Sequence, residues 1–115
     1  MHHRETARAG EQIAAEYLSR CGCEILQRNW RCPYGEVDLI AQDGQTLLFV
    51  EVKARHNVSY NFPREAVDAR KQTRLRQCAD LYLSLYAPEA PCRFDVVEVW
   101  WRAGKARIEW LRDAF

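Results

Sequence analysis

Apolar residues recur every three or four positions in two segments of the chain, and this spacing predicts two helices. The first helix is expected over residues 5–21, before Gly22, which favours a helix stop. The second is expected over residues 65–86, before the stretch APEAPC, whose prolines cannot continue a helix. Five shorter runs predict strands. These runs occupy residues 23–30, 35–41, 46–54, 93–101 and 106–111.

Two glycine-containing turns indicate how these strands pair. Asp43-Gly44, between the second and third strands, is a hairpin signal because glycine readily adopts the positive φ that tight hairpin turns require. Ala103-Gly104 joins the last two strands in the same way. The order helix, three strands, helix, two strands then predicts an α/β fold, a sandwich in which helices flank a central mixed sheet. At this length we expect one domain over residues 1–115 with a single core.

Four charged residues interrupt the second and third strands. Glu36 and Asp38 share one face of the second strand, because side chains alternate between faces, and Glu51 and Lys53 share one face of the third. They could form cross-strand ion pairs on a solvated face, each worth roughly a few tenths of a kcal/mol. However, the stretch LLFVEV is apolar at both parities, which indicates a strand covered on both faces. A buried glutamate and lysine are costly unless something binds them, so we favour a binding site.

The residue types at this position suit a divalent cation and a phosphate. Carboxylates that converge from adjacent strands provide the oxygen ligands that Mg²⁺ or Mn²⁺ prefers. A lysine two residues after such a glutamate, as Lys53 is after Glu51, can orient or deprotonate a water or stabilise charge on a phosphate. Arg55 follows Lys53 on the same face and is a candidate phosphate ligand. Lys71 lies on the inward stripe of the second helix, where it either extends to solvent or contacts a phosphate beside the site.

The same residues carry a resemblance. Asp38, twelve further residues and then Glu51-Val52-Lys53 resemble the D…(D/E)-x-K signature of the PD-(D/E)XK nuclease superfamily. Along nearly the whole chain the sequence is similar to the YraN family (UPF0102), which is described as endonuclease-like and related to archaeal Holliday-junction resolvases. The segments that carry this similarity are GEQIAAEYL, GCEILQRNWR, GEVDLIAQDG, LLFVEVKAR, AVDARKQTRL, RFDVVEV and WLRDAF. The resemblance implies a restriction-endonuclease-like α-β-β-β-α-β-β sandwich.

The resemblance also implies a role for each matching residue. Asp38 and Glu51 would be ligands of Mg²⁺ or Mn²⁺, and the main-chain carbonyl of Val52 would complete the site. Lys53 would be the catalytic lysine. Resolvase-like members add a glutamate from the first helix, and Glu11 matches it as a further ligand or catalytic base.

Helix geometry is compatible with that choice. At about 100° per residue, Glu11 lies at the border of the apolar stripe of the first helix, whereas Glu16 points to solvent. Alternatively, Glu11 is an acid near the helix start that the helix dipole favours. Val37 replaces the proline of the superfamily motif, which leaves the role of Asp38 unchanged. Glu36 fits the GE-x-D pattern of the family and is expected to be an outer-shell carboxylate.

The overall charge does not indicate a nucleic-acid partner. The chain has 17 basic and 16 acidic residues, a net charge of +1, and so lacks a global basic excess. Basic residues are concentrated in the second predicted helix, where they form either a solvated face or a binding patch. This cluster consists of Arg64, Arg70, Lys71, Arg74 and Arg76.

The location of the protein is inferred from absent signals. No run approaches the roughly 18 apolar residues of a membrane span, and MHHRETARAGEQ lacks a signal-peptide core. We therefore expect a cytoplasmic protein with no membrane partner. The five cysteines are odd in number and form no C-x-x-C pair, which favours neither a disulfide framework nor a zinc site.

These inferences lead to one main hypothesis and one alternative. The main hypothesis is a Mg²⁺- or Mn²⁺-dependent endonuclease-like protein that hydrolyses phosphodiester bonds in DNA, with branched or structured DNA included. The alternative is a non-catalytic nucleic-acid-binding module that keeps the nuclease-like fold and acts with a partner. Resolvase-like relatives work as dimers, so the resemblance is also compatible with a homodimer.

Overall fold

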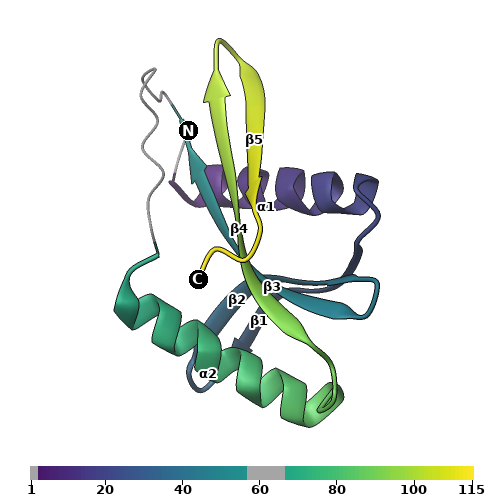
Figure 1. Cartoon of the computed structure of the whole chain (residues 1–115). Coiled ribbons are helices and arrows are strands. Elements are labelled where there is room, and N and C mark those ends of the chain that lie inside the picture. The colour runs from purple at the N-terminus through teal and green to yellow at the C-terminus, as the bar shows by residue number, and fades with distance from the viewer. Residues whose placement is uncertain (1–2, 57–66) are drawn as a thin grey trace.

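A five-stranded sheet lies between two helices in the computed structural model (Figure 1). The structure describes residues 3–56 and 67–115. The elements in chain order are α1 (His3–Arg20), β1 (Glu24–Cys32), β2 (Gly35–Asp43), β3 (Thr46–Arg55), α2 (Ala69–Tyr86), β4 (Cys92–Arg102) and β5 (Lys105–Leu111). This confirms the predicted order of elements and the α/β class.

The sheet is mixed, as predicted. Its strand order is β1-β2-β3-β4-β5, and every neighbouring pair is antiparallel except β3 and β4, which are parallel. A parallel pair needs a long crossover connection, and α2 lies within it. Both predicted glycine turns are confirmed: Asp43 pairs with Thr46 around Gly44, at φ +63°, and Gly104 adopts φ +76° between β4 and β5.

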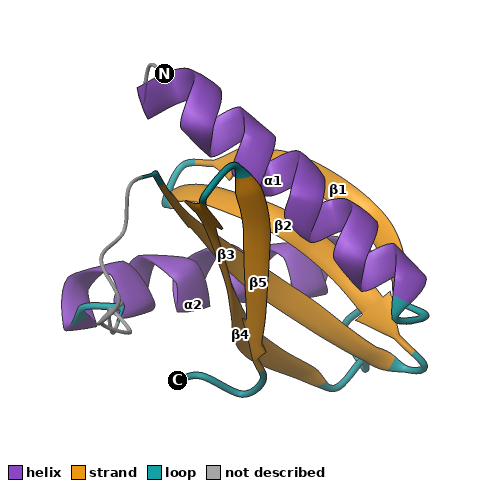
Figure 2. Cartoon of the chain, turned by 90° about the horizontal axis from the view of Figure 1, so that it is seen from above, coloured by secondary structure: helices purple, strands orange, loops and turns teal. Residues whose placement is uncertain are grey.

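Each face of the sheet is covered by one helix (Figure 2). On one face, Ala14, Ala15 and Leu18 of α1 pack in a cluster with buried residues of β2, β3 and β4. On the other face, the buried stripe of α2 packs against a cluster that includes Phe49. The stripe consists of Leu75, Cys78, Ala79 and Tyr82. The segment Leu47–Val50 of β3 is buried at both parities, which confirms that this strand is covered on both faces.

The first helix approaches the sheet closely at one glycine. A methyl group on Gly10 would overlap the β-carbon of Ala54 on β3, so only glycine fits at this crossing. At its other end α1 stops where predicted: Gly22 has φ +97°, and the Cys23 N–H donates to the Leu18 carbonyl at 3.0 Å. The crossing at Gly10 brings the neighbouring turn of α1 close to β3.

The second helix begins later than the sequence suggested. It starts at Ala69, four residues after the predicted start at residue 65, because Asp68 caps it. The backbone of Asp68 is extended, and its Oδ1 accepts a hydrogen bond from the Lys71 N–H at 2.8 Å. Residues 65–66 and Arg64 of the predicted basic cluster lie outside the described residues.

A buried carboxylate ties the end of the chain to β4. Asp95 is fully buried and accepts hydrogen bonds from the Arg93 guanidinium, the Trp110 indole N–H at 2.8 Å and the Asp113 N–H at 2.9 Å. Because its oxygens already accept these hydrogen bonds, we interpret Asp95 as a structural residue rather than part of a binding site.

All five cysteines are free thiols. Cys78 is buried on the apolar stripe of α2, and its Sγ lies 3.3 Å from Cys32 Sγ at the end of β1. Neither helix, within the described part of the chain, is long and apolar enough to cross a membrane.

Candidate functional site

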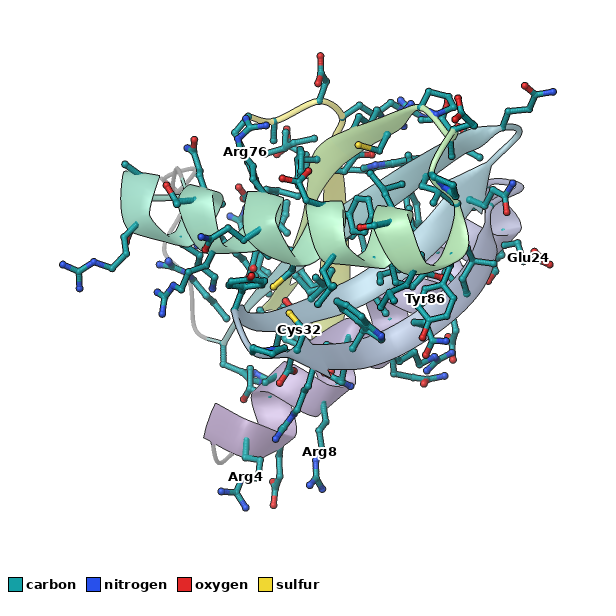
Figure 3. All side chains as sticks on the ribbon, turned by 90° about the horizontal axis from the view of Figure 1, so that it is seen from below. Arg4, Arg8, Glu24, Cys32, Arg76 and Tyr86 are labelled. Carbon is teal, nitrogen blue, oxygen red and sulfur yellow. The ribbon has the colours of Figure 1, made fainter. Side chains whose placement is uncertain are left out.

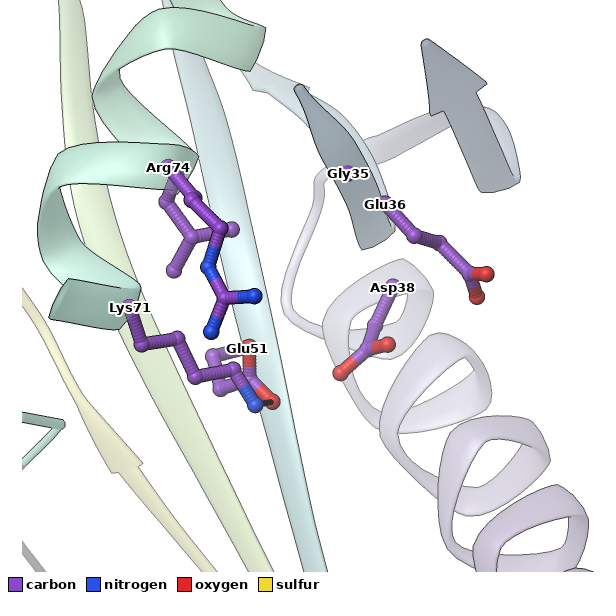
Figure 4. Close-up of a pocket in the computed structure, with 7 residues that line it drawn as sticks. Gly35, Glu36, Asp38, Glu51, Lys71 and Arg74 are labelled. Atoms are coloured by element: carbon purple, nitrogen blue, oxygen red, sulfur yellow. Dashed lines mark hydrogen bonds and ion pairs between the residues drawn. The ribbon is translucent and has the colours of Figure 1, made fainter. Parts of the chain in front are cut away.

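A pocket of about 280 Å³ opens beside β2, β3 and the first turns of α2 (Figure 4). Its lining combines carboxylates from the two strands with basic side chains from the helix. The lining residues are Gly35, Glu36, Asp38, Glu51, Lys71, Arg74 and Leu75. The structure thus brings together four of the predicted site residues, namely Glu36, Asp38, Glu51 and Lys71.

The pocket forms where the regular pairing of β2 with β3 stops. The last regular pair is Leu39 with Val50, and the next residue on each strand is a carboxylate, Asp38 and Glu51. Asp38 Oδ2 accepts a hydrogen bond from the Val52 N–H at 2.9 Å, and so satisfies a main-chain donor. Asp38 is therefore held against β3 by the backbone next to Glu51.

An ion pair from α2 closes the other side of the pocket. Lys71 Nζ lies 2.8 Å from Glu51 Oε1, and the Glu51 side chain is only 7% exposed, against 42% for Lys71. The position of Lys71 follows from the Asp68 cap, which fixes where the helix begins. Figure 4 shows the guanidinium of Arg74, one turn further along α2, directed toward the same region.

Burial and mutual repulsion perturb the acids of the pocket. Burial, followed by the nearby charge of Glu51, raises the pKa of Asp38 from 3.8 to about 8, although the Val52 hydrogen bond acts in the opposite direction. Burial alone would lower the pKa of Lys71, but its hydrogen bond and charge interaction with Glu51 outweigh this and raise it. The pocket therefore places a carboxyl group with a raised pKa beside a second carboxylate and an ammonium.

Glu11 lies close to this pocket but lines a different hollow. The close crossing of α1 over β3 at Gly10 places Glu11 beside β1, where its carboxylate is hydrogen-bonded to Asn29. Burial and the charges of Glu36 and Glu51 raise the pKa of Glu11, so these carboxylates interact electrostatically. The alternative of an acid near the helix start does not describe Glu11, because α1 begins eight residues earlier at His3, whereas Glu16 is exposed as predicted.

Two predicted residues of β3 lie beyond the pocket. Neither Lys53 nor Arg55 is among the described residues that line it. In the parallel register of β3 and β4, Lys53 lies opposite Glu98, a fully buried residue, and Arg55 lies opposite Trp100. Their roles at the site stay predictions.

Glu36 is directed away from the other carboxylates. The Oε2 atom of Glu36 forms an ion pair with Arg31 Nε at 3.0 Å. Figure 4 shows the Glu36 side chain turned away from Asp38. This geometry suits the outer position that the sequence suggested. Within residues 3–56 and 67–115, no group of three or more His, Cys, Asp or Glu side chains is close enough to hold a metal ion by itself.

Comparison with known proteins identifies the family. The model of a family described as "Uncharacterised protein family UPF0102" matches residues 10–99. The chain belongs to the UPF0102 family. A UPF0102 protein of Symbiobacterium thermophilum is 51% identical over 114 residues, which cover 97% of each chain. A UPF0102 protein of Moorella thermoacetica is 42% identical over 118 residues, covering 100% of this chain and 98% of the relative.

A solved structure is also similar to this UPF0102 chain. It is SfsA of Pyrococcus furiosus in complex with Ca²⁺, with a TM-score of 0.42 and 16% sequence identity. The match covers 95% of this chain and 63% of the SfsA chain.

Sequence reasoning did not assign three residues of this UPF0102 site. Arg74 was placed only in a general basic cluster, although its spacing of three from Lys71 puts it on the same helix face. Leu75, on the buried stripe of α2, carried no signal in the sequence that it lines a pocket. No local pattern around Gly35 marked it as a lining residue. These contacts depend on how distant elements meet.

Proposed function

We propose that this chain is a metal-dependent, endonuclease-like protein that hydrolyses phosphodiester bonds in DNA, with branched or structured DNA among its candidate substrates. The proposal includes the fold, because the order α-β-β-β-α-β-β around a mixed sheet supports a restriction-endonuclease-like (PD-(D/E)XK) assignment. The observation that carries the proposal is the convergence of Asp38 and Glu51 in one pocket with Lys71 and Arg74.

The donor set fits a divalent cation. Glu51 is buried and Asp38 lies half-buried beside it, and burial, followed by repulsion from the charge of Glu51, raises the pKa of Asp38. A cation between them would remove this repulsion, and carboxylate oxygens are preferred ligands of Mg²⁺ and Mn²⁺. The Val52 carbonyl and Glu11 are the additional donors that the family resemblance implies. When bound, the ion would supply Lewis-acid activation of a water and of the phosphate.

The remaining residues of the site would act on the substrate. Lys71 donates to Glu51 at 2.8 Å and, once Glu51 binds a cation, is free to donate to a phosphate oxygen. The guanidinium of Arg74 can bind the same phosphate through two parallel hydrogen bonds. Lys53 would stabilise the charge that develops on the phosphate, and Glu11 would orient the attacking water or accept its proton.

One observation favours the alternative of a non-catalytic nucleic-acid-binding module. Lys71 already neutralises Glu51, and a tight ion pair competes with a metal for the same carboxylate. In such a module the basic residues of α2 would contact phosphates without hydrolysis.

A cleavage assay separates the two functions. Linear, flapped and four-way-junction DNA would be incubated with Mg²⁺ or Mn²⁺ and the wild-type chain, Asp38→Asn or Lys53→Met. Asp80→Asn is the matched control, because Asp80 is an exposed acid on α2 outside this pocket. The proposal expects cleavage by the wild type and the control, and its loss in the two site variants.

Other outcomes decide against the proposal. Cleavage retained in both site variants would exclude this pocket as the active site. DNA binding without cleavage under either metal would support the binding module. Calorimetry adds a direct check of the metal, since Mn²⁺ binding should disappear in Asp38→Asn and in Glu51→Gln. Sedimentation analysis with and without junction DNA tests the homodimer.

A further inference from the structure

A second hollow, of about 550 Å³, lies between the first turns of α1 and the end of β1. It is separate from the pocket lined by Asp38 and Glu51, which we call the carboxylate pocket, and arginine dominates its lining. The lining residues are Arg4, Ala7, Arg8, Glu11, Asn29 and Arg31, which we call the arginine groove. Three guanidinium groups from two elements, against one lining carboxylate, give this hollow a positive charge.

The groove is built by the fold rather than by one helix alone. Arg4 and Arg8 are one turn apart on α1, and Figure 3 shows them projecting from the same side of the helix. Arg31 comes from β1, and the crossing of α1 over β3 at Gly10 sets the helix against the sheet. The Asn29 side chain is hydrogen-bonded to the Glu11 carboxylate, and both residues line the groove.

The groove adjoins the carboxylate pocket. Arg31 of the groove is ion-paired with Glu36 of the pocket at 3.0 Å, so one contact links the two hollows. Glu11 of the groove interacts electrostatically with Glu51 of the pocket. The carboxylate pocket therefore has basic residues of α2 in its own lining, and the arginine groove adjoins it across the Arg31–Glu36 ion pair.

A polyanion that crosses both hollows matches this arrangement. Guanidinium groups bind phosphates through two hydrogen bonds, and successive phosphates of a nucleic-acid strand can meet successive arginines. We infer that the arginine groove binds the phosphate backbone of a nucleic-acid strand next to the phosphate held at the carboxylate pocket. This inference rests on the proposed function for the class of ligand. It explains how a chain with a net charge of only +1 can bind a polyanion, since the basic residues are locally concentrated.

The test compares two charge removals on the same helix. The double variant Arg4→Gln/Arg8→Gln removes two groove charges, and Arg20→Gln removes an exposed arginine at the other end of α1. At about 1.5 Å per residue, Arg20 lies roughly 18 Å from Arg8 along the helix. Binding of fluorescently labelled single-stranded and duplex DNA would be measured by anisotropy in EDTA at 50, 100 and 200 mM salt. Urea unfolding of each variant checks that it is folded.

The expected result is specific to the groove. The double variant should bind about ten-fold or more weakly at the lowest salt, and the slope of log K against log salt should decrease by about 1.4–1.8, or 0.7–0.9 for each phosphate that is no longer neutralised. Arg20→Gln should change the dissociation constant less than two-fold. Equal binding and equal slopes in the double variant and Arg20→Gln would overturn the inference, as would a wild-type chain that binds no nucleic acid.

The same experiments distinguish this inference from the proposed function. Weakened binding in the double variant, together with a wild-type chain that cleaves nothing, would support the groove and reject the nuclease. Asp38-dependent cleavage with unaltered binding by the double variant would support the nuclease and reject the groove. Measuring binding in EDTA keeps the two results independent, because no metal is needed.

Discussion

Replacing Asp38 with asparagine is expected to stabilise the folded protein at pH 7.5. The pKa of Asp38 is raised from 3.8 to about 8 by burial and by the charge of Glu51. A group whose folded pKa is raised contributes stability that is fully present below its unfolded pKa and is lost as the pH rises through its folded pKa. The free energy of unfolding of the wild type should therefore decrease from about pH 4 to about pH 8.

The size of the effect follows from the shift. One pKa unit corresponds to about 1.4 kcal/mol, so a shift of about four units sets an upper limit near 6 kcal/mol. Between pH 5.5 and pH 7.5 the loss is at most about 3 kcal/mol, and we expect about half of this or more. Asparagine keeps the oxygen that accepts from the Val52 N–H, so the variant removes the charge without removing this hydrogen bond.

Urea unfolding monitored by tryptophan fluorescence measures this dependence. The wild type, Asp38→Asn and the exposed control Asp80→Asn would be unfolded at pH 5.5, 6.5, 7.5 and 8.5 in EDTA. Asp38→Asn should be the most stable chain at pH 7.5 and should show the weakest decrease with pH. A wild-type stability that is flat or rises with pH would refute this electrostatic account, as would an Asp38→Asn chain less stable than the wild type at pH 7.5. Adding Mg²⁺ at pH 7.5 should stabilise the wild type but not Asp38→Asn.

Three further changes test other contacts. Lys71→Met leaves Glu51 buried without its ammonium partner and should lower the free energy of unfolding at pH 7.5 by about 1.5–3 kcal/mol in urea titrations; an unchanged midpoint would contradict the ion pair. Gly10→Ala should cost about 1–3 kcal/mol in thermal melts despite its better helix propensity, because the new methyl overlaps Ala54. Adding Ala54→Gly should restore the stability, and failure to do so would argue against this crossing. Asp95→Ala should cost at least about 2 kcal/mol and alter native tryptophan fluorescence, because the Trp110 indole and the Asp113 N–H lose their buried acceptor.

Local sequence patterns predicted the elements and two turns. The periodicity of apolar residues is a local property, so it gave the order of helices and strands correctly. Gly44 and Gly104 adopt the positive φ that the hairpin prediction required. The start of α2 was wrong because its apolar stripe was extended past Asp68, although an aspartate is a favoured N-cap residue and was visible in the sequence.

The composition of the pocket was only partly predictable, for a geometric reason. Strand parity tells which residues share a face, and it placed Glu51, Lys53 and Arg55 together. It does not tell which of them lies opposite a neighbouring element, and positions two residues apart on a strand differ by about 6.6 Å. The Asp68 cap fixes the start of α2 and thereby sets Lys71 against Glu51, which leaves Lys53 beyond the pocket.

The arginine groove was invisible in the sequence because it depends on a single close approach. Arg4 and Arg8 resemble any exposed arginines of an amphipathic helix until the path of α1 is known. That path is set where Gly10 meets Ala54, a contact between residues 44 positions apart that no periodicity reports. Because the same crossing places Glu11 beside the carboxylates, Gly10 positions both the acid that the resemblance predicted and the basic surface that it did not. A larger side chain at this position would therefore displace both together. If the arginine groove binds nucleic acid as proposed, a folded Gly10→Ala chain should bind DNA more weakly than the wild type and should also show a pKa of Glu11 closer to its usual value.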